Sequence, residues 1–103
     1  MQTIDFPPDH LAQVRAGTKT TTVRYREDIA PGRVTLVFVG KETTSKVAAT
    51  VTRILPGRLS DLTDADAEAA GFADRAELVE QLTTVHYPGM PEDAEIAVVH
   101  FEV

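Results

Sequence analysis

The pattern of hydrophobic and polar residues divides the chain into short strands and short helices. In the strand segments, apolar side chains alternate with polar ones or form runs of β-branched residues, which is typical of strands with a buried face. The Pro56-Gly57 pair is expected to end the fourth strand, because both residues interrupt regular pairing. The pattern predicts five strands, at residues 3–6, 20–26, 33–40, 46–55 and 95–103.

Three further segments carry the end signals of helices. Proline is tolerated in a first helical turn, so Pro7-Pro8 predicts the start of a helix that ends at Gly17. Thr63 is a candidate N-cap of a second helix, which ends at Gly71. A third helix is expected over residues 74–85. The apolar stripe of this third helix consists of Leu78, Leu82 and Val85.

The order of these elements, β-α-β-β-β-α-α-β, predicts an α+β fold rather than a doubly wound parallel sheet. Five short strands in a chain of 103 residues favour a compact, partly open barrel with flanking helices. The length fits a single domain over residues 1–103. A domain of this size can bury a core without help from a metal or a disulfide.

Composition excludes several classes of site. Cysteine is absent, which removes disulfides, thiolate zinc sites and cysteine nucleophiles. His10, His86 and His100 lack the spacing of a metal site, so neither a metal nor another cofactor is expected. No apolar run approaches the about 20 residues of a membrane span. The first residues lack the basic and apolar regions of a secretion signal, so we expect a cytoplasmic protein with no membrane partner.

The net charge of −6 conceals an uneven distribution. Residues 1–60 hold nine Lys and Arg against five Asp and Glu, a balance of +4, whereas residues 61–103 hold one against eleven, a balance of −10. The acidic half is typical of solvated helices. A pI near 4.9 argues against a broad, nonspecific grip on duplex nucleic acid, which depends on neutralising phosphates. A local basic face on the first half stays compatible with the sequence.

The stretch from Gly17 to Arg24, GTKTTTVR, contains most of the candidate binding and catalytic residues. With Arg15 and Arg26 it brings four of the ten cations of the chain into twelve residues. Such crowding costs self-repulsion, so it indicates an anionic or strongly polar ligand. A threonine hydroxyl beside a lysine is also a candidate nucleophile with its base.

Strand alternation predicts where these side chains point. Val23 belongs on the core side of its strand. Thr22, Arg24 and Arg26 are therefore expected to face a cleft or solvent. Lys19 is out of phase with Thr22, but it can reach the same side if it lies in the turn before the regular strand. The alternative is an exposed, threonine-rich edge strand with a solvated lysine.

Several motifs occur together along the chain. Gly17-x-Lys19-x-x-Thr22-x-Arg24 follows a short helix, and after it come Leu62-Thr63, Ala70-Gly71-Phe72, Glu77-Leu78, Tyr87-Pro88-Gly89 and Val99-His100-Phe101-Glu102. In this combination the chain resembles the ASCH domain family of the PUA-like superfamily over nearly its whole length. The resemblance implies a small mixed β-barrel of about five to six strands, flanking short helices and a cleft lined by the lysine motif. It also implies a role connected with RNA or modified nucleosides.

One branch of that family hydrolyses the acetamide of N(4)-acetylcytidine with a threonine, a lysine and a glutamate. The motif lysine matches Lys19 and the motif threonine matches Thr22. When the flanking motifs are aligned, Ala70 takes the place of the glutamate. Glu68 lies two residues earlier, about 200° round a helix, and serves as the carboxylate if the helix unwinds there. The motif arginine matches Arg24, and the tyrosine of the Tyr-Pro-Gly turn matches Tyr87.

The leading functional hypothesis is a cleft that binds RNA, a nucleotide or a modified nucleoside. Its expected ligand-binding residues are Lys19, Arg24, Arg26 and Tyr87, of which the tyrosine either stacks on a base or packs on the barrel. His86, which precedes Tyr87, is a further candidate for ligand contact, whereas His100 is more simply a structural histidine. The protein is expected to be a monomer or a weak dimer.

The alternative is an amidohydrolase that acts on an acylated pyrimidine nucleoside such as N(4)-acetylcytidine. Its expected catalytic residues are Lys19 as base, Thr22 as nucleophile and Glu68 as carboxylate. Lysine acts as a base near neutral pH if desolvation or nearby cations lower its pKa. A ribonuclease-like hydrolase is a third alternative. A carboxylate within reach of Lys19 or Thr22 would favour the enzyme over a binding protein.

Overall fold

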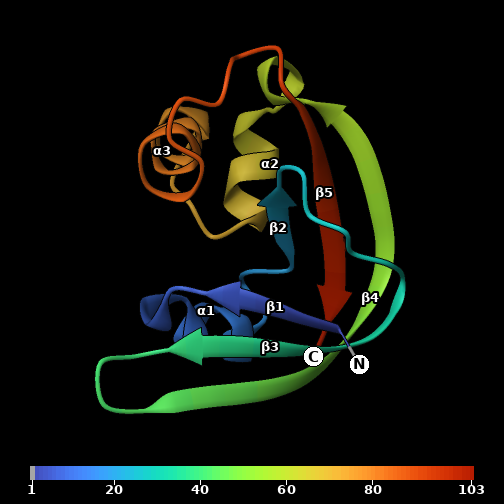
Figure 1. The fold of residues 1–103 in the computed structure, drawn as a ribbon, viewed down its shortest axis with the longest axis vertical. Coiled ribbons are helices and arrows are strands. Elements are labelled where there is room, and N and C mark those ends of the chain that lie inside the picture. The colour runs from blue at the N-terminus through green and yellow to red at the C-terminus, as the bar shows by residue number, and fades with distance from the viewer. Residues whose placement is uncertain (1) are drawn as a thin grey trace.

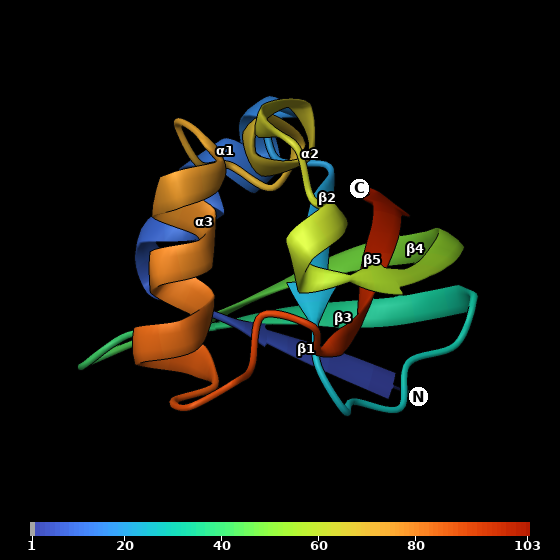
Figure 2. The same cartoon turned by 90° about the horizontal axis from the view of Figure 1, so that it is seen from above.

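In the computed structural model, which describes residues 2–103, a five-stranded sheet curls around one side of three short helices (Figures 1 and 2). The strand order is β1-β3-β4-β5-β2. The pairing of β1 with β3 is parallel, and the other three pairings are antiparallel. The strands are β1 (Gln2–Phe6), β2 (Thr21–Arg24), β3 (Gly32–Val39), β4 (Thr44–Arg58) and β5 (Glu95–Glu102). The result is the α+β fold that the order of the elements predicts, with the sheet open as a half-barrel.

The helices are α1 (Leu11–Ala16), α2 (Asp64–Ala69) and α3 (Arg75–Gln81). The 3-10 turn η1 (Pro8–His10) precedes α1, and a second 3-10 turn, η2 (Leu59–Asp61), precedes α2. The π-helical turn η3 (Leu82–His86) continues α3, so the helix expected over 74–85 changes its winding in its second half. Thr63 caps α2 as predicted, since its side chain accepts a hydrogen bond from the Asp66 backbone. No helix within residues 2–103 is long and apolar enough to cross a membrane.

Strand β4 differs from the prediction, because it continues through Pro56-Gly57 to Arg58. Strand β3 pairs with β4 only over residues 44–51, so beyond that point one edge of β4 has no neighbour in the sheet. Proline lacks a backbone N–H and is tolerated at such an edge. A bulge at Thr52 also shifts the alternation. Ile54 therefore packs against the core, and Arg53 is exposed.

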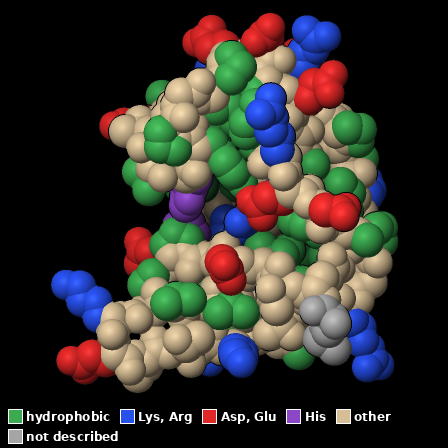
Figure 3. Space-filling view, in the orientation of Figure 1, with side chains coloured by type: hydrophobic (Ala, Val, Ile, Leu, Met, Phe, Trp, Pro, Cys, Tyr) green, Lys and Arg blue, Asp and Glu red, His purple; other side chains and the backbone are tan. Residues whose placement is uncertain are grey.

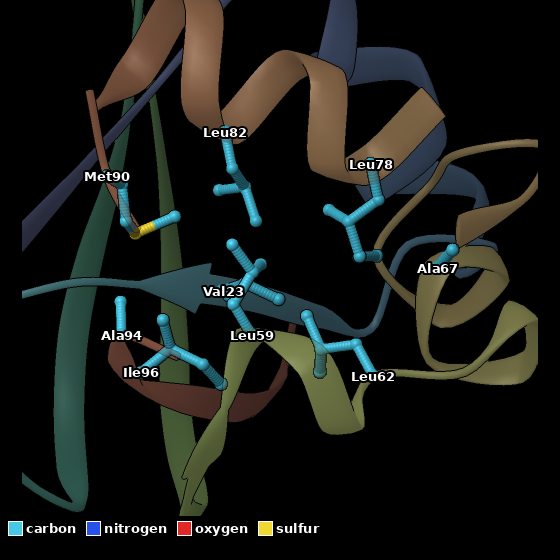
Figure 4. Packing of buried hydrophobic residues seen from close by; sticks show 10 residues of the cluster. Val23, Leu59, Leu62, Ala67, Leu78, Leu82, Met90, Ala94 and Ile96 are labelled. Carbon is cyan, nitrogen blue, oxygen red and sulfur yellow. The ribbon is translucent and has the colours of Figure 1, made fainter. Parts of the chain in front are cut away.

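Two clusters of buried side chains form the core. One lies between the curled sheet and α1, and includes Ile4, Val14 and Phe101. The other lies between β2 and the helices; Figure 4 shows Leu78 and Leu82 pointing from the α3–η3 segment toward Val23 on β2. The sheet edges β1 and β2 do not pair with each other. The seam between them, beneath the helices, is where the candidate site lies.

Candidate functional site

A pocket lies at the seam between β1 and β2, bounded above by α3 and η3. It holds about 350 Å³ of empty space, including space open to solvent. Figure 3 shows histidine and cationic side chains gathered at a hollow between the helical part of the molecule and the strands below it. The pocket is lined by Phe6, Pro7, His10, Lys19, Thr22, Val23, Arg24, Phe72, Leu78, Leu82, His86 and Tyr87.

The turn before β2 brings Lys19 to this pocket. Gly17 ends α1 in the left-handed conformation, with φ of 78°, which an L-residue with a side chain rarely adopts. The backbone N–H of Lys19 then donates to the Gln13 carbonyl, and that of Thr20 donates to the Ala69 carbonyl at 2.9 Å. This turn places Lys19 on the same side as Thr22 although strand alternation alone would separate them.

Lys19 is 3% exposed. Within residues 2–103, its ammonium forms no ion pair with a carboxylate. Its Nζ donates a hydrogen bond to the backbone carbonyl of Ala70. The Nζ also lies 5.5 Å from the centre of the Phe6 ring and 5.6 Å from that of Phe72. Burial, together with the positive charge of Arg24, lowers the pKa of Lys19 to about 7. A large fraction of Lys19 is therefore neutral at pH 7 and can accept a proton.

Thr22 and Arg24 meet in the same pocket. The Nε of Arg24 donates to the Thr22 hydroxyl oxygen at 2.9 Å, and one of its terminal nitrogens donates to the Asp5 carbonyl on β1 at 2.7 Å. The guanidinium lies 4.9 Å from the centre of the Phe6 ring. Arg24 therefore bridges the open seam of the half-barrel and fixes the Thr22 side chain.

Tyr87 reaches the pocket from the segment after η3. Its hydroxyl donates a hydrogen bond to the carboxylate of Glu27, which also lies 3.5 Å from Arg24. Burial and the hydrogen bond to Glu27 raise the pKa of Tyr87 to about 12, so the hydroxyl keeps its proton. The Tyr87 ring packs edge-on against Tyr25, with ring centres 5.6 Å apart. Tyr87 thus both lines the pocket and packs on the barrel.

Sequence reasoning missed Glu27 and gave His10 no part in the site. Glu27 follows Arg24 by three residues, but its position depends on the irregular loop after β2, which no periodic pattern describes. His10 and His86 both line the pocket. Burial, together with the positive charges of Lys19 and Arg24, lowers the pKa of both histidines. Both are therefore neutral at pH 7 and can donate or accept a hydrogen bond.

Two predicted site residues do not line the pocket. The side chain of Glu68 is exposed, because α2 stays helical through Ala69 and the unwinding that would turn Glu68 inward does not occur. Arg26 is exposed on the loop after β2, with φ of 56°, and its guanidinium lies over the Tyr25 ring at 5.0 Å. The roles of these two residues stay predictions. Within residues 2–103, no group of three or more histidine and acidic side chains is placed to hold a metal ion.

The fold is similar to that of several solved structures. An ASCH domain from Lactobacillus crispatus superposes with a TM-score of 0.71 at 13% identity, over 99% of this chain and 78% of that one. A point mutant of an ASCH protein from Zymomonas mobilis gives 0.69 at 17% identity, over 98% of this chain and 68% of that one. A protein of the DUF984 family from Enterococcus faecalis gives 0.69 at 14% identity, over 100% and 76%.

Sequence comparisons add nothing to these structural matches. No protein-family model matches the chain, and no curated protein matches it. The structural matches cover 98–100% of the chain at identities of 13–17%. By topology and superposition, the chain has the α+β fold of ASCH domains.

Proposed function

We propose that the pocket binds a base of RNA, of a nucleotide or of a modified nucleoside. The observation that carries the proposal is the set of aromatic rings and polar donors that converge on one pocket. Phe72 and Tyr87 supply ring surfaces, and unpaired bases are held by such surfaces in many RNA-binding proteins. Lys19 and Thr22 supply hydrogen bonds that would orient the base.

A wider hollow adjoins the pocket and gives room for the sugar. Its empty volume is about 790 Å³, including space open to solvent. The residues that line both the hollow and the pocket are Phe6, Pro7, Arg24, His86 and Tyr87. A base in the inner pocket would therefore leave its ribose against this outer hollow. The likeness to ASCH domains supports the proposal at the level of the fold.

Calorimetric titration with cytidine, N(4)-acetylcytidine, cytidine monophosphate and a short single-stranded RNA tests this function. We expect Lys19→Met and Tyr87→Ala to weaken the affinity at least about tenfold, in line with about 1–3 kcal/mol for a base–aromatic contact. Arg58→Ala is the matched control, because Arg58 lines a separate hollow with Pro56 and Glu95. Binding of none of these four compounds, or equal loss in the control, would refute the proposal.

A second candidate function is hydrolysis of an amide on an acylated pyrimidine nucleoside. The observation that favours it is the lowered pKa of Lys19, about 7, in the same pocket as the Thr22 hydroxyl. In this reaction neutral Lys19 takes the Thr22 proton as the oxygen attacks the amide carbonyl. The C–N bond then breaks, and the leaving amine takes the proton back from Lys19. Water hydrolyses the acyl-threonine ester and releases the acid.

Release of acetate from N(4)-acetylcytidine measures this activity directly. We expect Thr22→Val, which keeps the shape and removes the hydroxyl, to lower kcat by about 10³-fold or more, and Thr22→Ser to retain part of it. The rate should rise with pH through about 7, because the neutral form of Lys19 is the base. Turnover equal to that of Lys19→Met would rule out the hydrolase and leave the binding function in place.

A further inference from the structure

Each of the three nitrogens of the Arg24 guanidinium has a contact within the protein. Its Nε donates to the Thr22 hydroxyl oxygen, one terminal nitrogen donates to the Asp5 carbonyl, and the other lies 3.5 Å from the Glu27 carboxylate. A contact at each of its three nitrogens fixes the plane of the guanidinium, although three contacts do not use all five N–H groups of an arginine. Arg24 is well placed to hold a neighbouring group in one orientation.

Glu27 connects Arg24 to the opposite wall of the pocket. Its carboxylate accepts the hydrogen bond of the Tyr87 hydroxyl and forms the ion pair with Arg24. Tyr87 is set in turn by its edge-on contact with Tyr25 and by the bond from its backbone N–H to the Leu82 carbonyl. The chain of contacts therefore runs from the end of η3, through the loop after β2, to the nucleophile candidate on β2.

The bond to Arg24 fixes what Thr22 can do. The hydroxyl oxygen accepts from a charged donor, so the hydroxyl hydrogen is free to point to a ligand or a base. Without the ion pair, the bond to the Asp5 carbonyl and the contact with the Phe6 ring would hold the arginine less tightly, and its long side chain would sample more rotamers. The threonine would then lose both its orientation and the positive charge that stabilises a developing alkoxide.

We infer that Glu27 is a positioning residue of this site: its carboxylate holds Arg24 against the Thr22 hydroxyl and is itself held by Tyr87. The inference rests on the proposed function, because it concerns the group that a ligand or substrate would meet in the pocket. It adds a positioning role to two predicted ligand contacts. Arg24 acts on the ligand through Thr22, and Tyr87, besides offering its ring to a base, holds Glu27 in place.

The side-chain resonances of Arg24 test the contact in the protein without ligand. In ¹⁵N-labelled protein we expect the Arg24 Nε–H to exchange slowly with water. Glu27→Gln and Tyr87→Phe should each speed this exchange and shift the resonance, Glu27→Gln by about tenfold in rate, as expected for coupled neighbours. The double variant should add little to Glu27→Gln, because both changes interrupt one chain of contacts. Glu80→Gln, on the exposed face of α3, is the matched control and should change nothing.

Ligand measurements on the same variants then separate the two proposals. If Glu27→Gln and Tyr87→Phe free the Arg24 Nε–H and also weaken nucleoside affinity or lower kcat with KM unchanged, the positioning role is supported. If the resonance is unmoved by Glu27→Gln, the inference is overturned even where nucleosides bind. If the resonance moves but no nucleoside binds or reacts with the wild-type protein, the proposed function fails and the positioning of Thr22 stands.

Discussion

The burial of Lys19 both lowers the stability of the fold and leaves an amine that can act as a base near pH 7. Lys19 is 3% exposed, donates to the Ala70 carbonyl, and lies between two phenylalanine rings. A carbonyl and two ring faces stabilise an ammonium less than water does, so burial lowers its pKa. A carboxylate at position 70 would raise that pKa again. The alanine found there is therefore consistent with a lysine kept partly neutral.

The lowered pKa predicts a pH-dependent stability. Folding takes the pKa of Lys19 from 10.5 to about 7, so between these values the unfolded chain binds a proton that the folded protein lacks. Stability should therefore rise with pH from about 7 to 10.5. Lys19→Met should remove this rise and stabilise the fold at pH 7 by on the order of 1–3 kcal/mol, after the lost Ala70 hydrogen bond is subtracted. Urea unfolding at pH 7 and 9.5 measures both effects; an unchanged slope in the variant would contradict the assignment.

The residues of the site were predictable to different degrees. Alternation along β2, with the turn after Gly17, predicts that Thr22 and Arg24 share a side and that Lys19 can join them. The pocket contains all three. Arg26 was expected with them, but the chain leaves the strand after Arg24 and Arg26 takes a left-handed conformation. Glu27 follows that bend, so its place beside Tyr87 depends on a loop conformation that no residue pattern specifies.

The end of α2 is the element that anchors the lysine turn. Its last carbonyls accept hydrogen bonds from the segment around Lys19: Ala69 from the Thr20 backbone, Ala70 from Lys19, and Gly71 from the Gln13 side chain at 3.3 Å. Unpaired carbonyls are present at every helix end, and here they are satisfied by the site. The end signals Thr63 and Gly71 located this helix. They do not show that the helix presents its carbonyls, rather than a side chain, to Lys19.

Gly71→Ala tests this anchoring. Gly71 has φ of 90°, and a methyl group there would collide with the side-chain oxygen of Gln13. We expect a loss of about 1–3 kcal/mol in the free energy of unfolding, the usual cost of a strained backbone, and a shift in the pKa of Lys19 as Ala70 moves. Gly57→Ala is the control, because nothing lies within 4 Å of its added carbon. Equal stability of the two variants would show that the turn tolerates the change.

The predicted boundaries of strands were wrong where pairing within the sheet, rather than the local sequence, determines where a strand ends. Pro56 was expected to end β4, yet it occupies a stretch with a single neighbouring strand and is tolerated there. The bulge at Thr52 likewise depends on how β4 curls from β3 to β5. These features arise from pairing between distant segments, which a single sequence does not reveal.

At the scale of the whole molecule, the candidate site lies where the half-barrel is open, between the edge strands β1 and β2 that do not pair with each other. The edges β1 and β2 are linked there by the bond from Arg24 to the Asp5 carbonyl. The four clustered cations that suggested a basic patch are thereby divided. Lys19 is buried, Arg24 has contacts within the protein, Arg26 lies over Tyr25 outside the pocket, and Arg15 is exposed on α1.

This division predicts a weak salt dependence of RNA binding. When affinity comes from phosphate neutralisation, each phosphate contact on a single strand lowers log K by about 0.7 for every tenfold increase in salt concentration. With a net charge of −6 and its pocket cations buried or paired, the protein should make few such contacts. We expect the slope of log K against log salt for a short single-stranded RNA to be no steeper than about −1.5, with recognition resting on stacking and hydrogen bonds. Calorimetry over a salt series measures the slope. A slope of about −3 or steeper would mean that exposed cations outside the pocket bind the RNA phosphates directly. Arg26→Ala would then be the first variant to measure.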